Sequence, residues 1–360
     1  MKNRLTIFGI IFLLITTWFA IAACSNPAND TGKIQTTDPG IPQSHSGNSV
    51  IRSVVWGNGK FVAVSSSGGG IAYSTDGVTW VAVTETIFGK EGIDDIAWGN
   101  GKFIAVGGNP YMSGGRGRIA YSPDGITWSE VAVTTFGAGN GIYAVAWGNG
   151  KFVAVGDGGG AYSSDGVTWT AINGWLLVSS NESSQTVAWC NDRFVVGGIH
   201  GAIAYSSDGV TWTAVANSPF DIGMIYSSVA SGAIYGIAWG NGKFVTVGQY
   251  GVTGNPTSRI AYSSDGVNWA VVTDSTFGTS TIAGVAWGNG KFIANGIGGK
   301  MASSSDGVTW TPIVNNIFGA NTIFRTAWGN GKFVAVGGSS RIAYSMDGVN
   351  WVAVKDSKFP

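Results

Sequence analysis

Apolar residues occur along the chain in short runs of strand length, separated by turns of Gly, Asn, Asp and Ser. Residues 142–148, 151–156, 160–164 and 168–172 form one such set, rich in Val, Ile, Ala, Tyr, Phe and Trp. Asn149-Gly150 separates the first two runs and Asp165-Gly166 the last two; both pairs suit hairpin turns that need positive φ. The pattern predicts four antiparallel strands joined as a meander.

This four-strand unit is repeated seven times. Its first hairpin carries the phrase Ala-Trp-Gly-Asn-Gly-Lys-Phe, with small variations, and its second carries Tyr-Ser-Ser-Asp-Gly-Val-Thr-Trp. The first phrase places its Trp at Trp56, Trp98, Trp147, Trp189, Trp239, Trp287 and Trp328. The second places its Asp at Asp76, Asp124, Asp165, Asp208, Asp265, Asp306 and Asp347.

Four antiparallel strands repeated at about 45 residues predict an all-β fold, a seven-bladed β-propeller with four antiparallel strands per blade. We assign residues 50–360 to it. A stacked solenoid is the alternative. Helical solenoids need apolar residues at a period of 3.6 residues, which this sequence lacks, and parallel β-helices have shorter repeats.

The first 23 residues have the pattern of an export signal, in which Lys2 and Arg4 precede an apolar stretch that ends in small residues. An uncleaved membrane anchor is the alternative, since the stretch could just span a bilayer. Ile-Ala-Ala before Cys24 resembles the lipobox of bacterial lipoproteins, which implies cleavage before Cys24 and lipidation of that residue. Residues 24–49, rich in Ser, Asn, Pro, Thr and Gly, are expected to form a flexible tether.

Composition and charge reduce the number of possible function classes. The 58 Gly and 16 Trp are accounted for largely by the turns and hairpins of the repeat. The 20 basic and 20 acidic residues balance, so no basic footprint supports nucleic-acid binding. We expect an exported monomer that is held in the cell envelope through its lipid alone, with the outer membrane favoured. Ser25 lacks the Asp that some bacteria use for inner-membrane retention, and the leaflet stays open.

The second phrase resembles the Asp-box of sialidases and other BNR-type propellers, which runs Ser-x-Asp-x-Gly-x-Thr-Trp. In this chain the Gly follows the Asp directly, so the loop is one residue shorter in every copy. The resemblance covers the chain from about residue 50. It implies the propeller fold and a box that caps the hairpin between the third and fourth strands of each blade. Carboxylates repeated once per blade stabilise seven equivalent turns, whereas a reaction needs its acid and base once. We therefore expect the seven Asp to be structural.

Departures from the repeat indicate where a ligand binds. Residues 107–118 and 248–259 contain extra residues between strands two and three, and residues 216–235 enlarge one connection between blades. A meander places all three insertions on one face, opposite the uniform Asn-Gly and Asp-Gly turns, and such loops commonly carry binding residues. Seven positions, each four residues before a first-phrase Trp, are expected at the mouth of the channel: Arg52, Asp94, Tyr143, Gln185, Tyr235, Ala283 and Phe324.

Aromatic, Arg and Asp side chains on this face suit a polar ligand with flat surfaces, such as a glycan or a peptide. Drift of surface loops is the alternative explanation. The candidate ligand-binding residues are Arg52, Asp94, Tyr111, Arg116, Arg118, Tyr143, Tyr226, Tyr235, Tyr250, Arg259 and Arg325. His200 has no second His near it in sequence, so we expect no metal and no cofactor.

Three functions remain open. Sialidases carry a Phe-Arg-Ile-Pro motif near the start of the propeller; Phe324-Arg325 matches half of it, and in the last unit. With four Glu after the signal and no catalytic motif, we expect no enzyme activity. We favour a non-catalytic module that binds a glycan, or an envelope or host protein. The alternatives are a sialidase-like glycoside hydrolase and a scaffold for assembly of another envelope protein.

Overall fold

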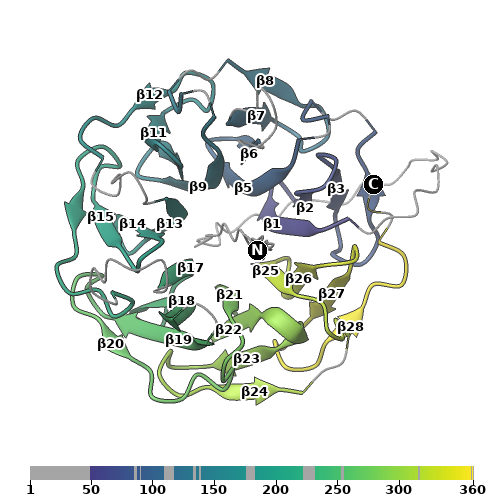
Figure 1. The fold of residues 1–360 in the computed structure, drawn as a ribbon. Helices are drawn as coiled ribbons and strands as arrows, with labels where there is room; N and C mark the ends of the chain where they lie inside the picture. Colours follow the sequence, from purple (N-terminus) through teal and green to yellow (C-terminus); the bar gives the residue numbers. More distant parts are fainter. Residues whose placement is uncertain are drawn as a thin grey trace, which may run out of the picture.

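The computed structural model describes residues 49–84, 87–89, 91–108, 117–132, 135–137, 139–175, 183–221, 232–252, 255–314, 317–357 and 359. These residues form seven four-stranded antiparallel sheets that stand as blades around a common axis (Figure 1). Every blade consists of four strands consecutive in sequence, from β1 to β4 in blade 1 to β25 to β28 in blade 7. The predicted seven-bladed propeller is confirmed.

The strands nearest the axis carry the first Trp of each unit. They are β1 (Ile51–Gly57), β5 (Ile93–Gly99), β9 (Ile142–Gly148), β13 (Ser184–Cys190), β17 (Ala233–Gly240), β21 (Ile282–Gly288) and β25 (Ile323–Gly329). The second strands are β2 (Lys60–Ser65), β6 (Lys102–Gly107), β10 (Lys151–Gly156), β14 (Arg193–Gly198), β18 (Lys243–Val252), β22 (Lys291–Gly296) and β26 (Lys332–Gly337).

The outer half of each blade is formed by shorter strands. The third strands are β3 (Ile71–Ser74), β7 (Arg118–Ser122), β11 (Gly159–Ser163), β15 (Ile203–Ser206), β19 (Asn255–Ser263), β23 (Met301–Ser304) and β27 (Ile342–Ser345). The fourth are β4 (Val81–Ala82), β8 (Ser129–Val131), β12 (Thr170–Ala171), β16 (Thr213–Ala214), β20 (Ala270–Val271), β24 (Thr311–Ile313) and β28 (Val352–Ala353). One 3₁₀ turn, η1 (Ile297–Gly299), precedes β23. Fourth strands this short expose little unpaired edge to another chain.

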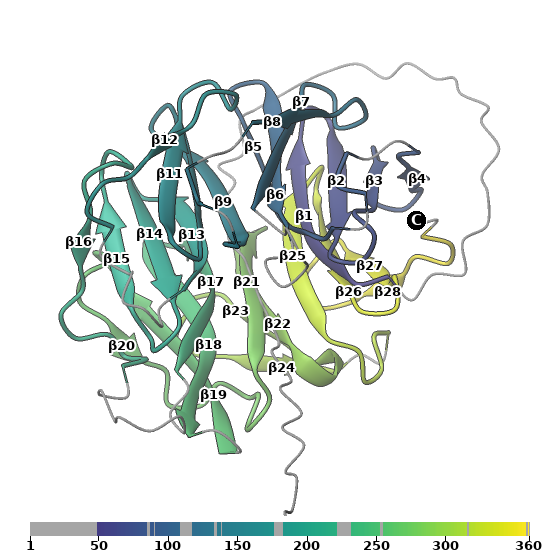
Figure 2. The ribbon, with the colours of Figure 1, turned by 45° about the horizontal axis from the view of Figure 1, so that its top comes forward.

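Two kinds of connection define the two faces of the ring. The turns from first to second and from third to fourth strand lie on one face, here called the turn face. The loops from second to third strand and the connections between blades lie on the other, the loop face (Figure 2). The Asn of all seven first turns has positive φ, as at Asn58 (47°). Gly follows it in six turns and Asp192, also with positive φ, in blade 4, so each turn is the two-residue hairpin predicted from the sequence.

The Asp-Gly loops are closed by hydrogen bonds inside each loop. In blade 3 the backbone N–H groups of Val167 and Thr168 both donate to Asp165 Oδ1 at 2.7 Å, and Ser163 Oγ donates to the same oxygen at 2.9 Å. The hydrogen bonds from Thr168 and Val167 lower the pKa of Asp165 to about 2. The structural role expected for these carboxylates agrees with this geometry.

Each first-phrase Trp packs between two blades. Its ring lies 4.4–4.7 Å, centroid to centroid, from the Phe on the second strand of its own blade, as in Trp98 and Phe103. Its other side lies against the glycine after the Trp of the preceding blade. A Cβ added at Gly57 would lie 2.2 Å from Trp98, and one at Gly240 would lie 1.9 Å from Trp287. Six blades have this glycine, and blade 4 has Cys190 instead.

Hydrogen bonds on the turn face join the same neighbours. The amide of Asn58 in blade 1 donates to Pro123 O in blade 2 at 3.1 Å, and Asn100 in blade 2 donates to Ser164 O in blade 3 at 3.0 Å. The same bond recurs at four further boundaries. Blade 4 uses Arg193 instead, whose Nη1 donates to Asp265 O at 2.6 Å. The two repeated phrases therefore recognise each other across blade boundaries.

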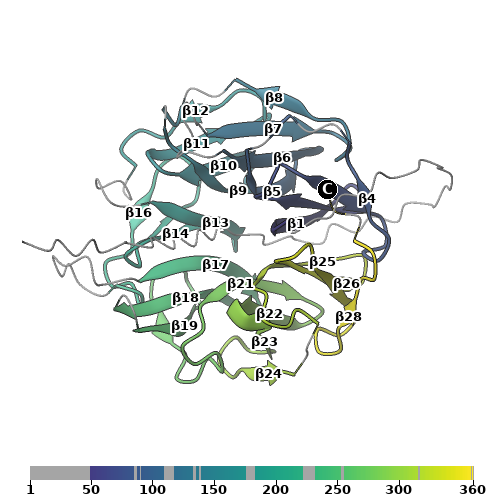
Figure 3. The same ribbon diagram turned by 45° about the vertical axis from the view of Figure 1, so that its right-hand side comes forward.

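Among the described strands, none is exchanged between the two ends of the chain to close the ring (Figure 3). Blades 7 and 1 share a core in which Phe359, from the C-terminal tail, is 4% exposed beside Ile51, Trp80 and Ile342. Five of the six connections between the other blades bury a Phe in the same way: Phe88, Phe136, Phe220, Phe277 and Phe318. The tail after blade 7 thus packs as these connections do.

The enlarged segment of blade 5 is a hairpin rather than a loop. Strands β18 and β19 pair continuously from Phe244 opposite Ser263 to Val252 opposite Asn255. Most of the extra residues of blade 2 and of the connection before blade 5 lie outside the described residues. Within the described part of the chain, no helix is long and apolar enough to cross a membrane.

Candidate functional site

A β-bulge lies at the start of every innermost strand. In each blade one residue has no partner on the second strand, and a bulge of this kind redirects a side chain. The bulged residues are Arg52, Asp94, Tyr143, Gln185, Tyr235, Ala283 and Phe324. These are the seven positions that the sequence placed at the mouth of the channel. They surround the propeller axis at its loop-face end, and we call them the inner rim.

Blades 1 to 3 give the inner rim a polar side. Arg52 Nε and Asp94 Oδ1 are 3.9 Å apart, and each side chain is 14% exposed. The Arg52 guanidinium also lies over the Phe324 ring, 4.9 Å from its centroid. In blade 3 the hydroxyl of Tyr143 donates a short hydrogen bond to Asp157 Oδ2. Three predicted site residues, Arg52, Asp94 and Tyr143, therefore lie on one arc of the rim.

Blades 5 to 7, together with Ile199 of blade 4, give the rim an apolar side. Seven hydrophobic clusters of the molecule each lie between two neighbouring blades. An eighth cluster lies at the inner rim and consists of Ala233, Tyr235, Ala283, Ile199, Ile297 and Phe324. The last three are half-buried. Phe324 occurs at this position in one blade and Tyr in two, Tyr143 and Tyr235, so this cluster is not required by the repeat.

A buried polar network lies directly beside the rim. Arg325 of blade 7 and Asp95 of blade 2 are 1% and 0% exposed, and Nη2 and Oδ1 are 2.6 Å apart. Ser53 of blade 1 donates to Asp95 Oδ1 at 2.7 Å, and the Val145 N–H of blade 3 donates to Asp95 Oδ2 at 3.0 Å. Arg325, predicted to contact a ligand, is thus part of a buried network that joins four blades. Its buried Nη1 has no hydrogen-bond partner among the described residues.

The acidic side chains of blade 2 have shifted pKa values. Burial, opposed by Arg52 and reinforced by the charge of Asp95, raises the pKa of Asp94 to about 6. Burial also raises the pKa of Asp95 and lowers that of Arg325, while the ion pair between them opposes both shifts. Asp94 is therefore the rim residue whose charge changes near neutral pH.

Arg118 and Arg259 lie away from the rim, at the loop-face end of a third strand. Four blades carry a cation there, and each donates to a backbone carbonyl of the connection that precedes its blade. The donors are Arg118, Arg259, Lys300 and Arg341, and their acceptors are Phe88, Pro219, Phe277 and Ile317, respectively. In the sequence, each of these cations directly precedes Ile-Ala-Tyr-Ser or Met-Ala-Ser-Ser. This recurrence is the sequence signal for a contact between a blade and its preceding connection.

The remaining predicted residues are dispersed. Tyr250 lies on the long hairpin of blade 5, where the Arg259 guanidinium is 3.2 Å from the centroid of its ring. Tyr111, Arg116, Tyr226 and the lipidation candidate Cys24 lie outside the described residues. His200 is exposed at a loop tip with a φ of 56°. In the parts of the chain that are described, no three His, Cys, Asp or Glu side chains come together as metal ligands would.

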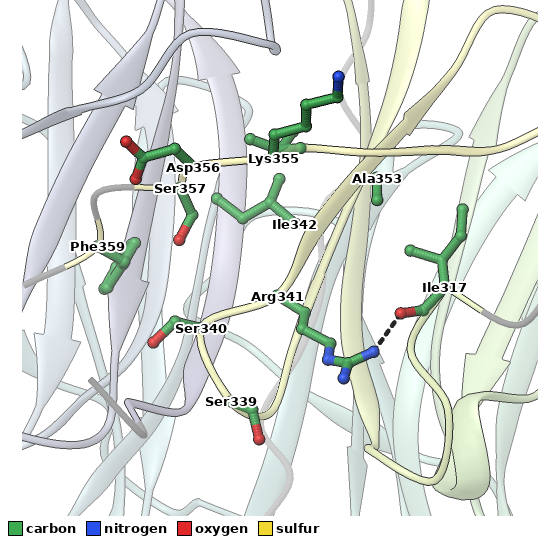
Figure 4. A pocket seen from close by; sticks show the side chains of 11 residues that line it. Ile317, Ser339, Ser340, Arg341, Ile342, Ala353, Lys355, Asp356, Ser357 and Phe359 are labelled. Atoms are coloured by element: carbon green, nitrogen blue, oxygen red, sulfur yellow. Dashed lines mark hydrogen bonds between the residues drawn. The ribbon is translucent and has the colours of Figure 1, made fainter. Parts of the chain in front are cut away.

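A cavity of about 420 Å³ lies where the ring closes (Figure 4). The loop between β26 and β27 and the C-terminal tail form its walls, and Ile342 and Phe359 give it apolar surface. Arg341 lies at its edge, with Nη1 bonded to Ile317 O. We call this cavity the seam pocket. Sequence reasoning missed it because it exists only once the tail has folded back between blades 7 and 1.

Comparison with known proteins shows the fold alone. No model of a protein family matches the sequence, and comparison with curated proteins finds no match. Among solved structures, YCF48 from Cyanidioschyzon merolae is 16% identical, with a TM-score of 0.57 over 82% of this chain and 94% of that chain. YCF48 bound to D1 peptide is 14% identical, with a TM-score of 0.58 over 82% and 92%. Streptogramin B lyase is 10% identical, with a TM-score of 0.61 over 86% and 95%.

The buried pair leads to a first prediction. Arg325→Met leaves the Asp95 carboxylate buried without its cation, so we expect it to lower the free energy of unfolding by about 3–5 kcal/mol. Arg325→Met combined with Asp95→Leu removes both charges and should lie within about 2 kcal/mol of the original protein. Urea unfolding of the single and double variants measures both values. A double variant as unstable as the sum of its single changes would contradict this account.

A second prediction concerns Asp94. Its folded pKa of about 6 exceeds the ordinary aspartate value of 3.8, so folding takes up a proton between these pH values. The stability contributed by the protonated form is present at low pH and is lost as pH rises through 6. Titration of side-chain carboxyl NMR signals should show one midpoint near pH 6 that disappears in Asp94→Asn, while that of Asp165 stays near 2. A midpoint for Asp94 below pH 5 would show that the carboxyl is hydrated.

Proposed function

We propose that this protein is a non-catalytic binding module of the bacterial cell envelope that holds a polypeptide segment on its inner rim. The division of the rim carries the proposal. Arg52, Asp94 and Tyr143 form a polar arc, and Tyr235 and Phe324 belong to an apolar arc that adjoins it where the Arg52 guanidinium lies over the Phe324 ring. A peptide offers both charged groups and apolar side chains within a few residues, which such a surface binds together.

Two further observations support a polypeptide ligand. The rim residues vary from blade to blade, as do the residues that follow them, whereas the rest of the strand is largely repeated. Packing of the blades therefore does not require one particular residue at the rim. A similar propeller, YCF48, has a solved structure whose description names a bound D1 peptide. We also infer that the Asp-Gly loops are shortened Asp-boxes with a structural role.

The proposal is tested with a displayed peptide library selected on the immobilised protein. We expect the selected peptides to bind at least about tenfold more weakly to Arg52→Ala and to Phe324→Ala, because each change removes part of one arc. Lys151→Ala, on the turn face, is the matched control and should bind normally. Circular dichroism and thermal unfolding confirm that each variant is folded.

Other outcomes separate the competing functions. Binding on a glycan array that is lost in the same two variants, without peptide binding, would replace the peptide by a glycan. Streptogramin B lyases share the fold, so turnover of a streptogramin B, or release of sugar from a glycosidase panel, would make the protein an enzyme. Binding that is insensitive to both rim variants would reject the inner rim as the site.

Lipid anchoring through Cys24 is part of the proposal and rests on the sequence that precedes that residue. Two acyl chains or more give stable membrane attachment. We expect the mature chain to begin at Cys24, to carry acyl groups by mass spectrometry and to fractionate with the outer membrane, whereas Cys24→Ala should lose the acyl groups. An unprocessed N-terminus, or a mature chain without added acyl mass, would rule the anchor out.

A further inference from the structure

The seam pocket contains an arginine whose binding edge is unoccupied. Arg341 is exposed, and its Nη1 donates to Ile317 O, which fixes the guanidinium beside the pocket (Figure 4). Among the described residues, neither Nε nor Nη2 has a hydrogen-bond partner, and Arg341 forms no ion pair. These two donors form the edge of a guanidinium that binds a carboxylate through two parallel hydrogen bonds.

Blade 2 shows the same position with the edge occupied. Arg118 corresponds to Arg341 in the repeat, and it likewise donates from Nη1 to a carbonyl of the preceding connection. Its Nε and Nη2 both lie 2.9 Å from Glu130 Oε1. Glu91 adds a second carboxylate, 3.1 Å from Nη1. In blade 2 the protein therefore supplies its own acid to this arginine.

Blade 7 lacks those acids. Glu130 pairs with Ala120 on the neighbouring strand, and the residue that pairs with the equivalent Ala343 is Ala353. Ala353 lines the seam pocket, so the space that a glutamate side chain would take belongs to the cavity. The substitution thus removes a counter-ion and leaves open volume at the same place.

The surroundings suit a small anion with an apolar part. Ser340 and Ser357 bring hydroxyl groups to the lining, and Ile342 and Phe359 bring apolar surface. Lys355 and Asp356 lie on the tail at the far side of the pocket from Ile317 and balance each other in charge (Figure 4). With Arg341 included, the charged groups of the lining sum to one positive charge.

We propose that the seam pocket is a second binding site, separate from the inner rim, which takes a carboxylate group of a small ligand on the Nε–Nη2 edge of Arg341. The ligand carboxylate occupies the place that the Glu130 carboxylate has in blade 2. The apolar surface of Ile342 and Phe359 receives the remainder of the ligand.

Acetate is the simplest probe, with glucuronate as a larger carboxylate and glucose as its neutral counterpart. Titration of the purified protein, followed by the arginine Nε–H signals in NMR, should shift one signal to saturation. That signal should be missing in Arg341→Lys. We expect half-saturation at about a hundred millimolar acetate, because an ion pair that is partly exposed contributes little free energy. Glucose should leave the signal unchanged.

Two variants make the test specific. Ala353→Glu rebuilds the acid of blade 2 without removing Arg341 and should weaken acetate binding about tenfold or more, because the new carboxylate occupies the edge. Lys300→Gln, at the same repeat position in blade 6 but outside the seam pocket, should bind acetate normally. An unsaturable shift, undiminished binding to Ala353→Glu, or tighter binding of sulfate than of acetate would overturn the assignment. Because both variants lie away from the inner rim, failure here leaves the peptide test unaffected.

Discussion

The contact between each first-phrase Trp and the glycine of the preceding blade is the interaction on which the ring depends. A side chain at Gly57 or Gly240 would enter the indole ring of the next blade. The close approach sets the spacing between innermost strands and lets the turn-face Asn reach the next Asp-Gly loop, as from Asn58 to Pro123 O. Because six boundaries share this contact, the blades are close copies of one another, and residues free of it are able to vary.

Closure of the ring depends on the same contact between Trp and glycine, since no described strand pairs across the boundary between blades 7 and 1. Gly329 of blade 7 packs against Trp56 of blade 1, as the equivalent glycines pack against the Trp of the next blade. Phe359 fills the space that Phe88 fills between blades 1 and 2. Arg325 then reaches past blade 1 to Asp95 in blade 2, so that the polar network spans the boundary where covalent continuity is missing.

The fold was predictable because its determinants are local and repeated. Asn-Gly and Asp-Gly specify turns wherever they stand, and the run lengths specify strands, so the strands of blade 3 agree with the prediction to within two residues. The inner rim was predictable for the same reason, as a fixed offset from each Trp. The environment of an individual side chain could not be predicted in this way. Arg325 follows the rim residue Phe324, yet it is buried against Asp95, and that pairing joins residues 230 positions apart in sequence.

The cations at the start of the third strands show where function is to be sought in a repeat protein. All four donate to a backbone carbonyl of the preceding connection, which makes that contact structural. The three arginines differ in what the rest of the guanidinium contacts. Arg118 is neutralised by glutamates, Arg259 lies on the Tyr250 ring, and Arg341 faces a cavity. A residue that is repeated in several blades can therefore have a specific role in one of them, because its partners differ from blade to blade. Among the four cations, Arg341 is the copy whose missing partner a ligand can supply.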